Sequence, residues 1–193
     1  MRQKAKNIYH MGVAFLANVW FGFPAKNLVS IGVTGTDGKT TTSSLIYKIL
    51  TLSGEKAAMI TTLGVQIGEE SYESGLHTTT PSSIFLQKYI KKIKEEGYKY
   101  LVLEVTSHAL DQNRVFGIPF EIGVLTNVTH EHLDYHKTYE SYLNAKLKLL
   151  LKSKIAIVNM DDKSYGSVSS KFKVPHFVKT SRGKRSSKFR RSR

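Results

Sequence analysis

Residues 31–42, IGVTGTDGKTTT, combine the residue types that bind a phosphate group. They follow a short apolar stretch and precede a helical pattern, which places a glycine-rich turn between a strand and a helix. Gly35 and Gly38 allow backbone N–H groups to face an anion, the helix start adds its positive dipole end, and Lys39 adds a point charge. Thr40 then offers a hydroxyl ligand to Mg²⁺. The stretch therefore predicts a phosphate-binding loop.

The glycine spacing of this loop departs from the strict G-x-x-x-x-G-K-[ST] pattern. That pattern requires glycine at position 33, where this chain has Val33 between Gly32 and Gly35. A chance glycine turn before a helix is the alternative, but strand, turn and helix signals coincide here. We therefore prefer the phosphate-binding loop.

A carboxylate at the end of a neighbouring strand would complete a magnesium site. Residues 98–105, YKYLVLEV, form the strongest strand pattern in the chain, and Glu104 lies near its end. Mg²⁺ prefers hard oxygen ligands, and a phosphate loop needs the ion. A glutamate at a strand end is otherwise commonly solvated, but the apolar run around Glu104 favours a functional role.

Two further features have competing interpretations. Residues 130–136, HEHLDYH, hold three imidazoles and two carboxylates in seven positions. That composition fits a metal site, but helix capping or buried hydrogen bonding places similar residues at a turn, so both interpretations stay open. Lys146 lies in an amphipathic helix pattern, where a lysine is usually solvated, and by itself it carries no functional prediction.

Strand and helix patterns alternate along the chain, which predicts an α/β fold with a doubly wound, mostly parallel sheet. The strand patterns cover residues 56–62, 98–105, 122–128 and 154–159. The helix patterns cover residues 40–54, 80–97 and 138–151, and residues 63–77 suit a hairpin or a loop. In such a sheet, ligands bind at the carboxyl ends of the strands. The phosphate loop, Glu104 and residues 130–136 are all expected at those ends.

The helix patterns also predict which side chains are buried. In the first helix, the expected buried stripe is Leu45, Ile46, Ile49 and Leu50. The second is expected to begin with Pro81 at its first position and to end at Gly97. Its apolar face is Phe85, Leu86, Tyr89, Ile90 and Ile93.

Composition bounds the class of protein. The 193 residues are 40% hydrophobic and 23% charged, which fits one globular domain with extensions. The absence of cysteine excludes a disulfide framework and thiol chemistry. Of the formal net charge of +14, residues 179–193 carry eight Lys or Arg and no acid, which leaves 14 − 8 = +6 elsewhere. We expect a disordered basic tail, which either contacts nucleic acid or anionic lipid or is the abnormal end of a truncated reading frame.

Residues 1–26 form a separate N-terminal segment in which a basic start precedes an apolar run at residues 11–23. This order resembles a signal peptide, but the run is too short to span a membrane, and Pro24 with Lys26 makes a poor cleavage site. A nucleotide site directly afterwards also argues against export, so we expect a cytoplasmic protein. We prefer an amphipathic helix that packs on the domain or lies on a membrane surface.

Four stretches of the chain resemble the ordered motifs of the Mur ligase family: GVTGTDGKTTT, HTTTP, EVTSHALDQNRV and LTNVTHEHLDYHKTYESYLNAK. They cover residues 29–165 and are most similar to the branch of UDP-N-acetylmuramoyl-tripeptide synthetases. The resemblance implies an ATP-dependent, ADP-forming ligase of peptidoglycan precursor synthesis. Such an enzyme phosphorylates the carboxylate of a UDP-N-acetylmuramoyl-dipeptide and then joins it to an amino acid.

The resemblance also implies roles for individual residues. The ATP-binding residues would be Gly35, Thr36, Asp37, Gly38, Lys39, Thr40 and Thr41. Lys39, Glu104, His132 and Lys146 would be catalytic; Thr40 and Glu104 would hold a first Mg²⁺, and His132 and Lys146 a second. Lys146 would be carbamoylated by carbon dioxide. The UDP-MurNAc-peptide would contact Thr79, Thr80, Thr106, Gln112 and Arg114.

The resemblance covers only part of a three-domain enzyme. We expect residues 1–26 to be the helical segment, 27–178 a partial central ATP-binding domain that is incomplete at its C-terminal side, and 179–193 the tail. A second polypeptide could supply the missing domains. The alternative function is a catalytically incomplete nucleotide-binding remnant or a partner-binding module.

Overall fold

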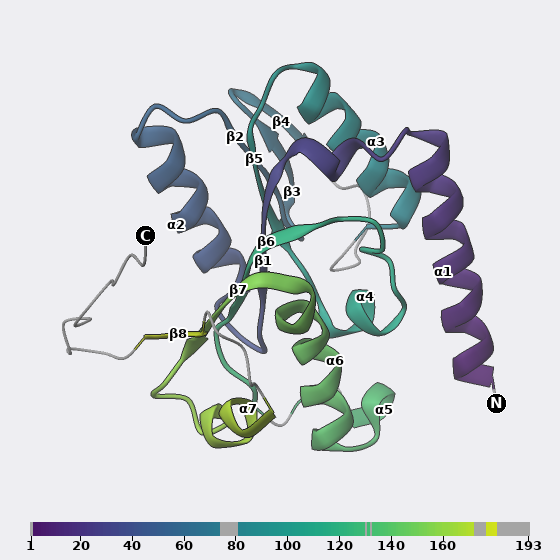
Figure 1. Ribbon diagram of the computed structural model, residues 1–193, viewed down its shortest axis with the longest axis vertical. Helices are drawn as coiled ribbons and strands as arrows, with labels where there is room; N and C mark the ends of the chain where they lie inside the picture. Colours follow the sequence, from purple (N-terminus) through teal and green to yellow (C-terminus); the bar gives the residue numbers. More distant parts are fainter. Residues whose placement is uncertain (1, 74–80, 130, 132, 172–176, 181–193) are drawn as a thin grey trace, which may run out of the picture.

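The computed structural model describes residues 2–73, 81–129, 131, 133–171 and 177–180, which form one sheet flanked by helices (Figure 1). The strands are β1 (Val29–Thr34), β2 (Ala57–Ile60), β3 (Gly64–Ile67), β4 (Glu70–Glu73), β5 (Tyr100–Glu104), β6 (Phe120–Leu125), β7 (Ser153–Asn159) and β8 (Phe177–Thr180). The helices are α1 (Arg2–Trp20), the 3₁₀ helix η1 (Pro24–Asn27), α2 (Lys39–Leu52), α3 (Ser83–Glu95), α4 (Ser107–Asp111), α5 (Leu133–His136), α6 (Tyr139–Lys152) and α7 (Tyr165–Lys171).

The strand order in the sheet is β4-β3-β2-β5-β1-β6-β7-β8. All neighbouring pairs from β2 to β8 in this order are parallel, whereas β3 and β4 form an antiparallel hairpin at one edge. After β1 the chain builds one half of the sheet, and after β5 it crosses to build the other half. The carboxyl ends of β1, β5 and β6 therefore meet at a topological switch point. The predicted doubly wound, mostly parallel fold is confirmed.

Helices cover the two faces of the sheet unequally. In Figure 1, α2 lies on one side, and α3, α4 and α6 lie on the other. The main hydrophobic cluster joins Leu86, Ile90 and Ile93 of α3 to Leu101 and Leu103 of β5, and all five side chains are fully buried. The i, i+4, i+7 spacing in α3 places its three residues on one helical face, as the sequence predicts.

The start of α3 differs from the prediction. Pro81 does not take the first helical position, because Ser82 is the N-cap and its hydroxyl accepts a hydrogen bond from Phe85 N at 3.3 Å. A serine N-cap satisfies a backbone donor that proline at this place would leave free. The predicted end is confirmed, since Gly97 adopts a φ of 76° and Tyr98 N donates to Ile93 O at 3.1 Å.

The predicted buried stripe of α2 is wrong in part. Leu45 and Ile49 are 57% and 63% exposed, whereas Ile46 and Leu50 are half-buried. The short side chain of Ser43 takes the fully buried position in this helix. Apolar periodicity identified the helix correctly, but it could not indicate how much of the apolar surface the sheet covers.

The N-terminal segment is helical, as predicted, and α1 packs outside α3 (Figure 1). Ala14 and Ala17 of α1 are buried. Among the described residues, no helix combines the length and the apolar character needed to cross a membrane.

The boundary of the predicted basic tail needs one change. Lys179 and Thr180 belong to β8, where they lie opposite Val158 and Asn159 of β7. Residues 181–193 lie outside the described residues, so the disordered tail stays a prediction there, as does the rest of the domain division.

Candidate functional site

The phosphate loop lies where the sequence places it, between β1 and α2. Gly38 is the N-cap of α2 with φ 74° and ψ 4°, a left-handed conformation that favours glycine. Lys39 begins the helix, and its Nζ donates a hydrogen bond to Thr36 O at 2.7 Å. The lysine side chain therefore already folds back over the loop that would surround a phosphate group.

Residues after β6 hold the loop from outside, and the sequence analysis did not identify them. Asn127 accepts a hydrogen bond from Asp37 N at 2.9 Å through Oδ1, and its backbone oxygen accepts one from Thr36 N at 3.0 Å. Thr126 Oγ1 donates to Asp37 O at 2.7 Å. A Cβ at Gly35 would collide with the Thr126 hydroxyl, so the loop requires glycine at this position. The only sequence signal for this support was the LTNV run at the end of the predicted strand.

Thr40 at the start of α2 and Glu104 at the end of β5 are in contact at the carboxyl end of the sheet, as the magnesium prediction requires. Thr40 Oγ1 donates to Glu104 Oε2 at 2.8 Å, and Thr62 N approaches the same oxygen at 3.3 Å. Glu104 is only 2% exposed. A hydroxyl and a buried carboxylate beside a phosphate loop are the hard oxygen ligands that Mg²⁺ prefers.

Lys146 is not the solvated lysine that an amphipathic helix usually carries. Its side chain is 1% exposed, its Nζ donates to Gly35 O, and the nitrogen lies 4.3 Å from the centre of the Tyr142 ring. Burial, and secondarily the charge of Lys39, lowers the pKa of Lys146 to about 7. The lysine therefore reaches the phosphate loop from α6 with an amine that is readily deprotonated.

A small pocket of about 80 Å³ joins the phosphate loop to α4 and α6. It is lined by Gly35, Lys39, Thr106, Ser107, His108, Tyr142 and Lys146. Thr106 is also the N-cap of α4, because its hydroxyl accepts a hydrogen bond from Ala109 N at 3.2 Å. Tyr142 OH lies 3.2 Å from Thr36 Oγ1, which links α6 to the loop a second time.

His136 is a buried residue that the sequence analysis did not select from HEHLDYH. It is 7% exposed, and its Nε2 lies 3.0 Å from Ser107 Oγ in the wall of the pocket. Buried hydrogen bonding is therefore the correct interpretation for this histidine. The described residues contain no cluster of three or more His, Cys, Asp or Glu side chains that could hold a metal ion. The second-metal prediction at His132 lies outside the described residues.

Of the predicted peptide-contact residues, Thr106 lines this pocket, and Gln112 and Arg114 contact each other after α4. Arg114 Nε donates to Gln112 Oε1 at 2.8 Å, and Gln112 Nε2 donates to Tyr135 OH at 3.2 Å. Burial lowers the pKa of the half-buried Arg114 guanidinium, yet the group stays charged at neutral pH. Thr79 and Thr80 lie outside the described residues. Of the remaining predicted ATP contacts, Asp37 and Thr41 are exposed at the loop and the first turn of α2.

The fold and the site define a parallel α/β domain with a phosphate loop after its first strand. The Mur ligase middle domain matches residues 33–193, so the chain belongs to the Mur ligase family. That match runs past residue 165, the last position of the resembling motifs, and through the basic C-terminal segment.

Similar proteins agree on the branch of the family. The chain is 42% identical over 154 residues to UDP-N-acetylmuramoyl-L-alanyl-D-glutamate–2,6-diaminopimelate ligase of Clostridium botulinum, covering 80% of this chain and 31% of that protein. It is 47% identical over 152 residues to the ligase of the same name from Aquifex aeolicus, covering 78% and 31%. The chain thus spans about a third of the length of these relatives.

Solved structures support the fold. A structure of a UDP-N-acetylmuramoyl-L-alanyl-D-glutamate–2,6-diaminopimelate ligase matches with a TM-score of 0.72 and 31% identity, over 84% of this chain and 34% of that one. FolC of Escherichia coli matches with a TM-score of 0.66 at 18% identity, over 86% of this chain and 45% of that one. At this low identity the FolC match shows the fold alone.

Proposed function

We propose that this chain binds ATP with Mg²⁺ and is the phosphate-handling part of an ADP-forming ligase that adds an amino acid to a UDP-N-acetylmuramoyl-dipeptide. The observation that carries the proposal is the convergence of three groups at one end of the sheet: Lys39, the Thr40–Glu104 pair and the buried Lys146. The similar ligases support the substrate class, because they are named for this dipeptide.

Each part of the site has a proposed task in ATP binding. Lys39 and the backbone of residues 35–38 hold the β- and γ-phosphates, supported by Thr126 and Asn127. Thr40 and Glu104 hold the first Mg²⁺, which supplies charge neutralisation on the phosphate oxygens. His132 and Lys146 are assigned to the second.

The proposed reaction is a carboxylate activation followed by an acyl transfer. A carboxylate oxygen of the dipeptide attacks the γ-phosphorus of ATP, the new O–P bond forms, and the bond to the ADP oxygen breaks. The amine of the amino acid then attacks the acyl carbon, loses a proton, and expels phosphate as the amide forms. The chain contributes by orienting the reactants and by placing cations where negative charge accumulates.

The burial and the lowered pKa of Lys146 are compatible with carbamoylation of this lysine. A buried amine with a pKa of about 7 has a substantial neutral fraction near neutral pH, and only the neutral amine reacts with carbon dioxide. The reaction joins the nitrogen of the neutral amine to the carbon of CO₂ and releases one proton, so a neutral amine becomes a carbamate anion. A carbamate beside the phosphate loop would offer oxygen ligands to Mg²⁺ where an ammonium would repel it.

Thr106, Gln112 and Arg114 are assigned to the peptide end of the precursor, together with Thr79 and Thr80. The Arg114 guanidinium provides the charge that a carboxylate-bearing peptide requires. Thr106, which lines the small pocket beside the phosphate loop, supports the assignment of the peptide to the α4 side of that loop.

The test is phosphate release by the purified chain with ATP, Mg²⁺, UDP-MurNAc-L-Ala-D-Glu and either diaminopimelate or lysine. We expect release that requires all components and disappears in Lys39→Ala, with ATP affinity reduced at least tenfold. Lys48→Ala is the matched control, because Lys48 is an exposed lysine on the same helix. Release equal in the wild type and Lys39→Ala contradicts the proposal.

The second candidate is a nucleotide-binding remnant or partner-binding module without ligase activity. It needs only the phosphate loop, which Gly38, Lys39 and the start of α2 form within this chain. ATP binding that depends on Lys39, without phosphate release unless a second polypeptide is added, is the result expected for this candidate.

Lys146 can be tested without an activity measurement. In buffer with ¹³C-labelled bicarbonate, we expect one carbamate carbon signal in the wild-type chain that is absent in Lys146→Met. A signal that persists in Lys146→Met assigns the carbamate to another amine.

A further inference from the structure

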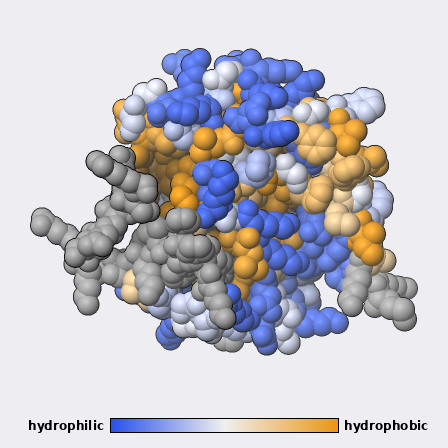
Figure 2. Space-filling view, in the orientation of Figure 1, coloured by the Kyte–Doolittle hydropathy of each residue, from blue (hydrophilic) through white to orange (hydrophobic). Residues whose placement is uncertain are grey.

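The side of α1 that faces the domain carries polar side chains in its N-terminal half, followed by Ala14 and Asn18 in its C-terminal half. Gln3, Asn7 and His10 follow one another at i, i+4 and i+7, and Ala14 and Asn18 continue the same stripe. The opposite side exposes Ile8, Leu16, Val19 and Trp20. Figure 2 shows hydrophobic side chains along the margin of the molecule where Figure 1 places α1. The inner stripe is therefore the part of α1 that makes directed contacts.

The N-terminal half of α1 reaches the end of α4. Asn7 Nδ2 donates to Asp111 Oδ2 at 3.0 Å, and Gln3 Nε2 donates to Tyr135 OH at 2.6 Å. Tyr135 OH donates to Asp111 Oδ2 at 3.1 Å, and Lys148 Nζ lies 2.9 Å from Asp111 Oδ1. Burial alone would raise the pKa of Asp111, but the hydrogen bonds from its neighbours bring it below its ordinary value. Asp111 is thus a charged anchor shared by α1, α5 and α6.

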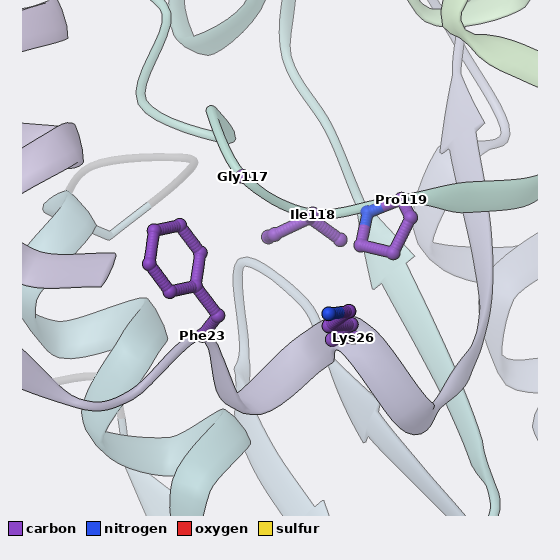
Figure 3. A pocket seen from close by; sticks show the side chains of 5 residues that line it. All are labelled: Phe23, Lys26, Gly117, Ile118 and Pro119. Carbon is purple, nitrogen blue, oxygen red and sulfur yellow. The ribbon is translucent and has the colours of Figure 1, made fainter. Parts of the chain in front are cut away.

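The C-terminal half of α1 contacts the end of the loop that follows α4, residues 112–117. Asn18 is fully buried, and its Nδ2 donates to Phe116 O at 2.8 Å. Gly117 follows with a φ of 81°, and a Cβ there would overlap the Asn18 side chain. Beyond it, Gly117, Ile118 and Pro119 line a pocket with Phe23 and Lys26 from the segment after α1 (Figure 3). Residues 116–119 therefore lie against the C-terminal half of α1 and the segment that follows it.

The loop held between these two contacts, residues 112–117, carries the proposed peptide-binding side chains. Gln112 and Arg114 hydrogen-bond each other, and Asn113 between them has a φ of 55°. Ser83 Oγ of α3 donates to Arg114 O at 3.0 Å. A loop with a left-handed residue at its centre depends on surrounding contacts to keep one conformation. Asn7 and Asn18 supply those contacts on both sides.

We propose that α1 is a positioning helix for the precursor site, with Asn7 and Asn18 clamping the two ends of loop 112–117 so that Gln112 and Arg114 stay oriented. The inference rests on the proposed role of Gln112 and Arg114 in precursor binding. It makes residues 1–26 part of the site rather than a separate segment. Asn7 and Asn18 act through the loop and are positioning residues.

The first experiment measures binding of UDP-MurNAc-L-Ala-D-Glu and of ATP by calorimetry. We expect Asn7→Ala and Asn18→Ala each to weaken precursor binding about tenfold and to change ATP affinity less than twofold. Ile8→Ala and Val19→Ala are matched controls on the exposed side of α1, and both affinities should stay within twofold. Equal losses for the two ligands would mean general destabilisation and would overturn the clamp.

A charge exchange separates positioning from simple packing. Asn7→Asp places a carboxylate against Asp111 and should weaken precursor binding about tenfold. The double variant Asn7→Asp/Asp111→Asn restores one carboxylate and one amide to the pair, and it should recover most of the lost affinity. A double variant as weak as Asn7→Asp contradicts the assigned contact.

Amide hydrogen exchange tests the clamp without any ligand. We expect exchange in residues 112–117 to accelerate at least tenfold in Asn7→Ala and Asn18→Ala and to stay unchanged in the two controls. Unchanged exchange in both variants overturns the inference. If the wild-type chain binds ATP but not the precursor, the clamp is overturned and the ATP site is unaffected. If the wild-type chain does not bind ATP, the proposed function is rejected.

Discussion

The phosphate loop and loop 112–117 serve two ends of one proposed reaction, but different parts of the chain stabilise them. The phosphate loop is a continuous motif whose own glycines, lysine and helix start create the anion site. Loop 112–117 begins within the EVTSHALDQNRV stretch, but no local backbone signal defines its conformation, which depends on Asn7 and Asn18 of α1 and Ser83 of α3. A site built from local backbone is visible in the sequence, whereas a site built from distant side chains is not.

The largest expected effect is on the phosphate loop. In Gly35→Ala, the new Cβ overlaps the Thr126 hydroxyl, so the loop must move. We expect ATP affinity to fall at least tenfold and the free energy of unfolding to drop by about 1–3 kcal/mol. Calorimetry and denaturant unfolding measure both quantities. Gly166→Ala is the control, because a Cβ there meets open space; a wild-type ATP affinity in Gly35→Ala would show that the loop tolerates the shift.

Lys146 gives the region around the phosphate loop a pH dependence above neutral pH. Its pKa is about 7 in the folded chain and 10.5 ordinarily, so between these values the unfolded chain binds more protons. The contribution of Lys146 to the free energy of unfolding should therefore rise with pH from about 7 to 10.5, by at most ~1.4 kcal/mol per pH unit.

This prediction is checked by unfolding the wild type, Lys146→Met and the surface control Lys48→Met across that range in buffer free of carbon dioxide. Lys146→Met should remove the slope, and Lys48→Met should keep it. Parallel curves for all three proteins would show that Lys146 titrates normally.

Loop 112–117 should respond to Gly117→Ala with a loss of stability alone. Alanine at a φ of 81° is strained, and its Cβ meets Asn18, so we expect the free energy of unfolding to fall by about 1–3 kcal/mol while ATP affinity is unchanged. The additional substitution Asn18→Ala should relieve part of this cost, because it removes the colliding side chain. If the free energy of unfolding of the double variant falls by the sum of the two single effects, the cost of Gly117→Ala does not come from the contact with Asn18.

The smallest effect should come from Thr126→Val. The substitution keeps the shape of the side chain but removes the hydrogen bond to Asp37 O, which Asn127 Nδ2 still approaches at 3.1 Å. We expect a loss of about 1 kcal/mol in unfolding free energy and a two- to threefold weaker ATP affinity. A tenfold loss of ATP affinity would mean that the phosphate loop depends on its neighbours as much as loop 112–117 does.

Much of the fold could be predicted from periodicity and capping residues. The helix pattern at residues 138–151 corresponds to α6, and Thr138 caps this helix, since its hydroxyl accepts a hydrogen bond from Ser141 N at 3.1 Å. The apolar strands and the parallel sheet were predicted for the same reason, since these signals lie within a few neighbouring residues. The exposure of Leu45 and Ile49 was not predictable, because it depends on how far α2 stands from the sheet.

The candidate site divides in the same way. Glu104 could be selected because it ends a strongly apolar strand, and the structure places it 2.8 Å from Thr40. Thr126, Asn127 and His136 could not be selected, since no local pattern distinguishes them and their contacts form only when the chain folds. The resemblance to the family, rather than the residue pattern, pointed to Lys146.

The sequence by itself determined the elements, the phosphate loop and the Thr40–Glu104 pairing of a loop with a neighbouring strand. Backbone conformation and apolar periodicity are local properties, so neighbouring residues encode them. Only the tertiary structure decided that Lys146 is buried against Gly35 and that α1 holds loop 112–117. Burial changes the protonation of an amine and distant contacts fix a loop, and both effects exist only once the helices pack against the sheet.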